Sequence, residues 1–310
     1  MSTFPSFYNP NQIGTLHYPD LATVAAAATA TQFSSADQDS KPIHLLIIDM
    51  QIDFTHQQGA LFVPGAQEDL RRLIEFIYAN VDRISKISCT LDSHTQHQIF
   101  HHAWWADADG NHPAPFTLIS AADVAACNWQ PLRQPDWSRR YVQQLEAAGK
   151  QVLTIWPYHV GLGAIGNALD PALYTAVFYH SIARQVEPNF LMKGTLPASE
   201  NYSIFGLEVP LPDAPQQGRN QTLLDELAAA NQVIIAGEAE SHCVLASVSD
   251  LVADFATRDG NPLRNVYLLQ DATSSVQHPD IDFQTIARQR YTQFAEQGLN
   301  LATTETVQLG

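Results

Sequence analysis

The chain has 310 residues, of which 45% are hydrophobic and 15% are charged, so it can bury a large core in one α/β domain or two smaller ones. Acidic residues outnumber basic ones by 32 to 16, and the net charge of −16 disfavours nucleic acid and anionic membranes as partners. The sequence contains no apolar run of about 18 residues, the length that would indicate a membrane span.

The cysteines and the N-terminal segment both favour a cytoplasmic location. The three cysteines, Cys89, Cys127 and Cys243, are an odd number, which does not make a complete disulfide framework and is typical of a reducing compartment. Residues 1–19 are polar and rich in turn-forming residues, and they lack the basic and then apolar layout of a signal peptide. We therefore expect a cytoplasmic protein.

Residues 1–40 show no steady hydrophobic period, and we expect them to form an N-terminal arm. Their alanine-rich part, 21–31, could form a short helix, although threonine and serine weaken that pattern. The pattern changes near residue 42, so residues 41–310 are expected to form the main domain.

Short apolar runs alternate with helical patterns in the rest of the chain. Apolar residues have helical spacing at 66–85, 223–230 and 243–256. The apolar runs typical of buried strands are 44–49, 87–91, 189–192, 232–236 and 265–270, with a shorter run at 152–155. This alternation predicts a doubly wound, mostly parallel α/β sheet with helices on both faces.

Reactive side chains follow the ends of the predicted strands. They are Asp49, Asp92, Lys193, the loop from Gly237 to Cys243, and Asp271. Ligands of open α/β sheets bind at the carboxyl ends of the strands. The sequence therefore predicts one site along this edge of the sheet.

Cys243 follows a turn that contains glycine and begins a predicted helix. The positive end of a helix and its exposed N–H groups would lower the pKa of this thiol and could hold an oxyanion. From the loop alone, a nucleophile and a small buried cysteine are equally good interpretations. The neighbouring His242 is not expected to be its base, because adjacent helical residues point about 100° apart.

Asp49 and Lys193 both emerge from apolar strands, where a charged side chain needs a partner or a function. Taken alone, each also has an ordinary interpretation. Asp49 could cap the turn that follows it, and Lys193 could reach solvent. A half-buried lysine beside a carboxylate could instead orient and polarise a substrate.

The histidine-rich segment 92–102 is the strongest local indication of a metal. Asp92 and His94 stand two residues apart at a strand end, and a mixture of Asp and His suits zinc, iron or manganese. A solvated, histidine-rich loop is the alternative interpretation, because no distant third ligand is evident from this segment alone.

Five short motifs occur in order between residues 43 and 257. They are Asp49-Met-Gln-Ile-Asp-Phe54, Asp92-Ser-His94, Trp156-Pro-Tyr-His159, Lys193-Gly194 with Tyr202-Ser-Ile-Phe205, and the loop from Gly237 to Val244. Any one of these motifs is a weak signal. Together they resemble the motif series of the nicotinamidase branch of the isochorismatase-like hydrolases.

The resemblance implies a catalytic role for each matching residue. Cys243 would be the nucleophile, Asp49 would accept the proton of its thiol, and Lys193 would be the third member of the triad. The backbone N–H groups of Ala239 and Cys243 would form the oxyanion hole, next to a cis peptide bond between Glu238 and Ala239.

The resemblance also implies a cofactor and a ring pocket. One divalent transition metal is expected, with zinc as the first choice and iron or manganese as alternatives, and it would hold the ring nitrogen of the substrate. The implied metal ligands are Asp92, His94 and His159. The implied substrate-binding residues are Phe54, Trp156 and Tyr202.

Two features depart from the compact nicotinamidases. Val160 follows His159, where those proteins usually have cysteine. An insert at about 103–150 holds four tryptophans and a predicted helix at 138–148. Because its two ends flank the implied metal ligands, we expect a folded lid over the pocket mouth, with an assembly surface as the alternative.

The implied function is a cysteine-dependent amidohydrolase that converts nicotinamide to nicotinate and ammonia through a thioester. Another small amide is the alternative substrate. A non-catalytic binding or scaffold protein with the same fold is the alternative outside this class. We also expect a homo-oligomer.

Overall fold

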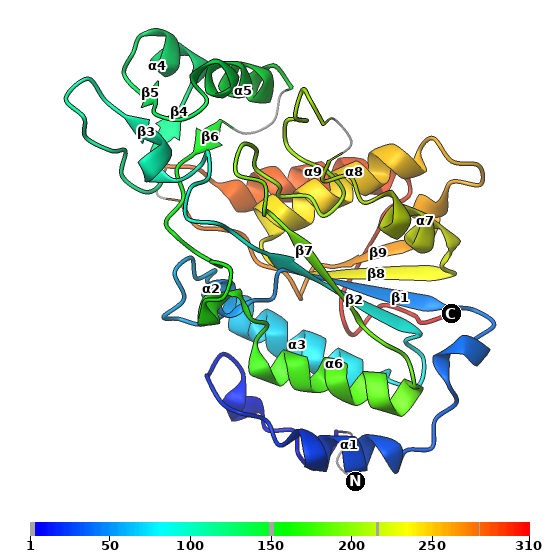
Figure 1. The fold of residues 1–310 in the computed structure, drawn as a ribbon. Helices are drawn as coiled ribbons and strands as arrows, with labels where there is room; N and C mark the ends of the chain where they lie inside the picture. Colours follow the sequence, from blue (N-terminus) through cyan, green and yellow to red (C-terminus); the bar gives the residue numbers. More distant parts are fainter. Residues whose placement is uncertain (1–3, 149–151, 215–216, 279) are drawn as a thin grey trace.

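Six parallel strands form the central sheet of the protein, in the order β10-β9-β8-β1-β2-β7 (Figure 1). The computed structural model describes residues 4–148, 152–214, 217–278 and 280–310. The strands are β1 (Ile43–Ile48), β2 (Lys86–Asp92), β7 (Asn189–Lys193), β8 (Gln232–Gly237), β9 (Val266–Leu269) and β10 (Asn300–Ala302). The predicted parallel α/β sheet is therefore confirmed, and β10 extends it by a strand that the sequence pattern did not indicate.

Strand β1 lies between two hydrophobic cores. All six of its side chains are buried. Leu45 and Ile47 belong to one core, and Leu46 and Ile48 belong to the other, because successive side chains of a strand point to opposite faces. Such a strand needs cover on both faces.

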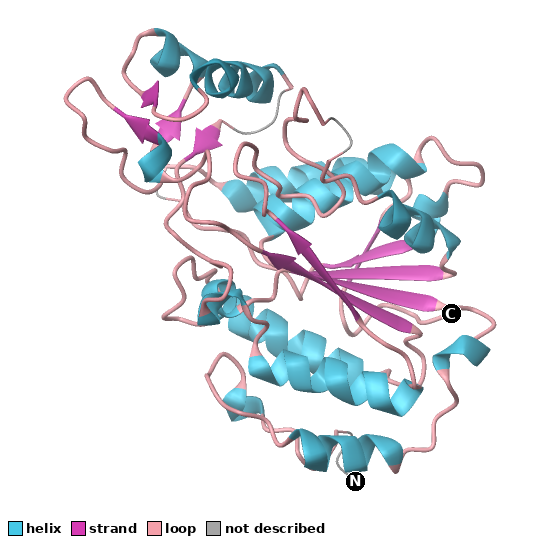
Figure 2. Cartoon of the chain, viewed as in Figure 1, coloured by secondary structure: helices cyan, strands magenta, loops and turns pink. Residues whose placement is uncertain are grey.

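Helices lie in layers on both faces of the sheet (Figure 2). One layer consists of α3 (Ala66–Ala79) and α6 (Pro171–Arg184). The other consists of α7 (Gln221–Ala229), α8 (Leu245–Phe255) and α9 (Phe283–Gln297). The short helix α2 (Ile52–Thr55) follows β1. The three helices predicted from spacing correspond to α3, α7 and α8.

The sequence prediction missed α9 and also α6, whose buried side chains are spread around most of its circumference. The Asp170 carboxylate caps α6 by accepting from the N–H groups of Ala172 and Leu173, and Pro171 begins its first turn. Helix α6 packs on α3 and also on α1 (Leu21–Thr29). A helix covered on two sides has no clear polar stripe, so the amphipathic pattern that reveals α3 is weak in α6.

The N-terminal segment packs against the main domain through α1. Val24 and Ala28 join the core beneath α6. The backbone N–H of Gly14 donates to the capping carboxylate of Asp170 at 3.0 Å. The segment expected as an arm therefore contains a helix that covers the outer side of α6.

The insert forms a small subdomain near the carboxyl ends of the strands (Figure 1). Its helix α5 corresponds to the helix predicted at 138–148, and residues 149 and 150 of the insert lie outside the described residues. The apolar run at 152–155 contains β6, which pairs with β4 of the insert and not with the central sheet. The elements are β3 (Trp105–Ala106), β4 (Leu118–Ile119), α4 (Ala121–Ala125), β5 (Gln130–Pro131), α5 (Pro135–Ala147) and β6 (Leu153–Thr154).

Within the described parts of the chain, every helix is too short or too polar to cross a membrane.

Candidate active site

The strand register brings the predicted reactive residues to one place. In the sheet, Ile48 at the end of β1 pairs with Gly237 of β8, and Asp92 of β2 pairs with Lys193 of β7. The four central strands therefore end side by side, and Asp49 follows β1 directly. Asp271, at the end of β9, does not join this group, because its carboxylate accepts from the N–H and hydroxyl of Thr304 at 2.8 and 2.7 Å.

Lys193 is the centre of the group. Its Nζ lies 2.8 Å from Asp49 Oδ2, 3.1 Å from Asp92 Oδ1 and 3.4 Å from Cys243 Sγ. It also donates to the backbone oxygen of Asn201 at 3.1 Å. Lys193 and Asp49 are buried, with 3% and 0% of their surface exposed, so this ammonium group is held entirely by protein atoms.

Burial and charge shift the pKa values of Cys243, Asp49 and Lys193. Burial raises the pKa of the Cys243 thiol well above its ordinary value, although the ammonium of Lys193 opposes that shift. Burial also raises the pKa of Asp49, again against Lys193. For Lys193, burial disfavours the charge, but Asp49 and Asp92 outweigh it and hold its pKa well above the ordinary value. The low thiol pKa expected from a helix N-terminus is therefore wrong, because burial dominates at Cys243.

Cys243 stands in a short π-helix, Glu240–Val244, which leads from β8 into α8. Strand β8 ends at Gly237, where φ is 135° and a Cβ atom would lie 2.1 Å from the backbone oxygen of Ile48. Only glycine fits so close to β1. The peptide bond between Glu238 and Ala239 is cis, as expected, and Ala239 and Cys243 both line the pocket.

Three buried side chains beside the triad can hold a metal ion. One potential ligand atom from each of Asp92, His94 and His159 lies within 4.8 Å of the other two. His94 Nε2 lies 2.9 Å from Asp92 Oδ2. His159 Nδ1 lies 2.7 Å from the carbonyl oxygen of Pro157, so Nδ1 carries the proton and Nε2 keeps the free lone pair that a metal needs.

The charge states also suit a metal. Burial and the neighbouring His94 lower the pKa of His159 to about 4, so its imidazole is neutral at pH 7. Burial would raise the pKa of Asp92, but His94 and Lys193 outweigh burial and hold that pKa well below its usual range. A carboxylate beside neutral imidazole is a donor set that zinc, iron and manganese accept.

A second acidic group near the pocket, Asp49, Asp92 and Cys243, is also compact enough to hold an ion. Lys193 already forms ion pairs with both carboxylates and lies against the sulfur. An ammonium group in this position repels a cation, so this group does not suit a metal ion.

Gly194 leaves room for the side chains of Asp92 and His94. Its φ is 78°, and a Cβ atom there would lie 2.2 Å from Asp92 Oδ1 and 2.9 Å from the ring of His94. Behind Asp92, Gln51 makes two backbone hydrogen bonds: it donates to the Asp92 oxygen and accepts from the Asp92 N–H, both at 2.8 Å. The position of Asp92 is therefore fixed by the backbone as well as by its charge partners.

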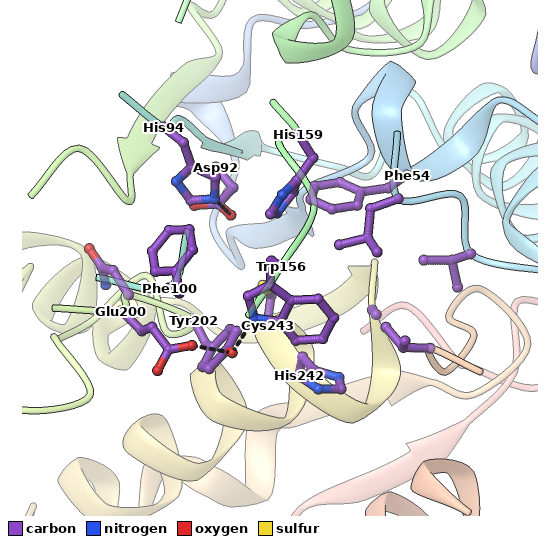
Figure 3. Close-up of a pocket in the computed structure, with 15 residues that line it drawn as sticks. Phe54, Asp92, His94, Phe100, Trp156, His159, Glu200, Tyr202, His242 and Cys243 are labelled. Carbon is purple, nitrogen blue, oxygen red and sulfur yellow. Dashed lines mark hydrogen bonds and ion pairs between the residues drawn. The ribbon is translucent and has the colours of Figure 1, made fainter. Parts of the chain in front are cut away.

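The predicted substrate-binding residues surround the space in front of Cys243 (Figure 3). The pocket is lined mainly by aromatic and aliphatic side chains, with Asp92, His94, His159 and Cys243 as its reactive groups. Phe54 lies edge-on to His159, with ring centroids 5.6 Å apart. Trp156 and Tyr202 form an aromatic wall that is joined by a hydrogen bond of 2.8 Å.

Sequence reasoning missed several residues that support the site. Thr90 donates to Asp49 Oδ1 at 2.5 Å, and the side chain of Asn201 accepts from the N–H of Gly194 at 3.2 Å. Glu200 also lines the pocket. Thr90 sits inside a predicted strand, two residues before Asp92, which is the one signal that could have indicated an inward-pointing polar group. For Asn201 and Glu200, which lie in a loop, the sequence offers no such signal.

No protein-family model matches the chain, and a search of curated proteins finds no relative in sequence. Solved structures do match. The yeast nicotinamidase superposes with a TM-score of 0.57 at 17% identity, covering 84% of this chain and 99% of its own. The nicotinamidase/pyrazinamidase of Acinetobacter baumanii gives 0.56 at 16% identity, covering 86% and 99%. The chain has the nicotinamidase fold.

A third protein with the nicotinamidase fold, from L. infantum and in complex with nicotinate, matches with a TM-score of 0.51 at 18% identity, covering 86% of this chain and 95% of its own. At such identities the match establishes the fold. The chemistry of this chain must be argued from its own side chains.

Proposed function

We propose that the protein is a hydrolase that cleaves a small carboxamide, with nicotinamide as its substrate and Cys243 as its nucleophile. One observation carries the proposal: the Lys193 ammonium lies 2.8 Å from the Asp49 carboxylate and 3.4 Å from Cys243 Sγ, at the base of an aromatic pocket. The nicotinamidase fold supports the same reaction class.

The first step is attack of sulfur on the amide carbon. Because burial raises the thiol pKa, Cys243 is protonated at rest and needs a base. Asp49 is the base, since its carboxylate lies within 4.8 Å of Sγ and burial raises its pKa above the ordinary value, which makes it a stronger base. As the S–C bond forms, the proton moves from Sγ to Asp49, and Lys193 balances the charge.

The second step is loss of ammonia. The tetrahedral oxygen would be held by the backbone N–H groups of Ala239 and Cys243. Asp49 returns the proton to the leaving nitrogen, and the C–N bond breaks to give ammonia and a thioester on Cys243. Asp49 then takes a proton from water as the water oxygen attacks the thioester carbon. The C–S bond breaks to release the carboxylic acid, and Asp49 returns the proton to Sγ.

The metal site has the chemistry to orient the substrate ring. Asp92, His94 and His159 would hold a divalent transition metal, and zinc, iron and manganese all suit these donors. The bound ion would act as a Lewis acid toward a ring nitrogen of the substrate. Phe54, Trp156 and Tyr202 would enclose the ring from the sides.

The direct test is ammonia release from nicotinamide, pyrazinamide and a set of small aliphatic amides. We expect the aromatic amides to be hydrolysed and nicotinamide to have the highest kcat/KM. Iodoacetamide trapping at pH 7 provides a second measurement, because Asp49 would accept the proton of the Cys243 thiol as the sulfur is alkylated, whereas a buried cysteine with no base beside it is inert. A protein that hydrolyses none of these amides would contradict the proposal.

A further inference from the structure

A hydrogen-bonded chain connects the insert to the wall of the pocket. Tyr141, on α5 of the insert, has no exposed surface. Its hydroxyl donates to Glu200 Oε2 at 2.9 Å and accepts from the Glu200 N–H at 3.1 Å. One side chain of the insert thus holds both the carboxylate and the backbone of Glu200.

The other carboxylate oxygen of Glu200 holds the aromatic wall. The Tyr202 hydroxyl donates to Glu200 Oε1 at 2.6 Å, and Trp156 Nε1 donates to the Tyr202 oxygen at 2.8 Å (Figure 3). An indole N–H can only donate, so the Tyr202 oxygen accepts from it and directs its own proton to Glu200. The chain therefore has one direction, from Trp156 to Glu200.

Because Glu200 is buried, the hydrogen-bonded chain is sensitive to the loss of any of its side chains. Glu200 is 2% exposed. Burial raises its pKa to about 7, although the hydrogen bonds from Tyr202 and Tyr141 lower it. A buried carboxyl group is costly without hydrogen-bond partners, and bonds in such a chain polarise one another. Removal of the Tyr141 hydroxyl should therefore weaken the hydrogen bonds that hold Tyr202 and Trp156.

The hydrogen-bonded chain also determines which atoms of Trp156 and Tyr202 are left to contact a ligand. The N–H of Trp156 and the O–H of Tyr202 are both directed within the wall. Ring faces and edges are left for contact, and they suit a flat, uncharged ring better than an anion, because the face of an aromatic ring carries partial negative charge.

We infer that Tyr141 and Glu200 are positioning residues that fix the rings of Trp156 and Tyr202 and so set the affinity of the pocket for a flat, uncharged aromatic amide. This inference rests on the proposed amide hydrolysis. It gives the insert a part in substrate choice that does not require the insert to open or close, because α5 acts through Tyr141 on the pocket wall.

The kinetic test compares Tyr141→Phe, Glu200→Gln and the double variant. Tyr141→Phe should raise KM for nicotinamide about fivefold to twentyfold, the effect of a lost buried hydrogen bond, with kcat changed less than about threefold. Glu200→Gln should raise KM at least as much. The effect of the double variant should be smaller than the two single effects combined, because Tyr141 acts through residue 200.

Val142→Ala is the matched control. Val142 is the next residue on α5, is 1% exposed and packs in the core of the insert. Its truncation loosens the insert without removing a member of the chain, so KM should stay within about twofold of the parent. Equal effects of Val142→Ala and Tyr141→Phe on KM would overturn the inference, as would additive effects of Tyr141→Phe and Glu200→Gln.

A spectroscopic measurement separates this inference from the proposed function. The protein has five tryptophans, and the indole N–H signal of Trp156 is assigned by its loss in Trp156→Phe. Tyr141→Phe should shift that signal, and Val142→Ala should not. A parent protein that releases no ammonia refutes the hydrolase proposal, whereas an unshifted Trp156 signal in Tyr141→Phe and Glu200→Gln refutes the positioning chain.

Discussion

The floor and the wall of the pocket are built in different ways. The floor consists of Asp92 and Cys243, which line the pocket, and of Asp49 and Lys193, which support them. Asp49, Asp92 and Lys193 stand at or directly after the ends of parallel strands, and ion pairs of 2.8 and 3.1 Å join Lys193 to the two carboxylates. The wall consists of Trp156 and Tyr202 in loops, held by Glu200 and, through it, by the insert. The difference indicates that the sheet fixes the chemistry and that loops can change the substrate without disturbing it.

The largest effect is expected at the floor. Cys243→Ala should lower amide turnover by about four orders of magnitude, because it removes the atom that forms the covalent intermediate. Ammonia release measures the rate, and circular dichroism checks that the variant is folded. Retention of more than a tenth of the parent activity would show that the floor does not act through Cys243.

The next effect is on metal content. His159→Ala should reduce bound transition metal from about one ion per chain to a small fraction, since three protein ligands are needed. Elemental analysis of protein purified without chelator measures this. His97→Ala is the control, because His97 is exposed in the same histidine-rich segment and its loss should leave the content unchanged. Equal metal content in both variants would show that His159 is not a metal ligand.

A smaller effect tests the space around the metal-binding side chains. Gly194→Ala and Gly163→Ala both place alanine at a positive φ, 78° and 80°, at a cost of roughly 1–2 kcal/mol each. Only at Gly194 would the new Cβ meet Asp92, whereas at Gly163 nothing lies within 4 Å. Competitive chelator titration should therefore show metal affinity lowered about tenfold or more in Gly194→Ala alone. Similar metal affinities in the two variants would mean that the new Cβ at position 194 does not displace Asp92.

The last effect concerns His242, which packs behind the wall against the rings of Trp156, Tyr202 and Phe283. Burial lowers its pKa to about 4 from an ordinary 6.5, so the unfolded chain binds more protons than the folded one between these pH values. Folding stability should therefore fall as the pH drops through this window and should be unaffected above it. His242→Asn removes the titrating ring.

Urea unfolding from pH 7 to pH 4 measures this difference. The slope of unfolding free energy against pH should be shallower in His242→Asn by up to about 1.4 kcal/mol per pH unit, which corresponds to one proton. Parallel curves for the two proteins would mean that His242 is not neutral in the folded state.

The floor could be predicted from the sequence and the wall only in part. Asp49, Asp92 and Lys193 each end an apolar run, and parallel strands bring such ends together. Trp156 and Tyr202 were expected from motif resemblance alone. Glu200 could not be found, because its partners Tyr141 and Tyr202 stand 59 and 2 residues away and no periodicity links them. Helix α6 was missed for a related reason: it packs on two sides, so its sequence has only a weak amphipathic pattern.

The N-terminal segment has a consequence for the order of folding. The Gly14 N–H bonds to Asp170, 156 residues away in sequence, and α1 lies on α6. Contacts between such distant segments are slow to form, because a long loop must close first. Helix α1 should therefore dock after the sheet and α6 have assembled. During refolding, amides in α1 should gain protection from hydrogen exchange later than those in β1, although α1 is synthesised first.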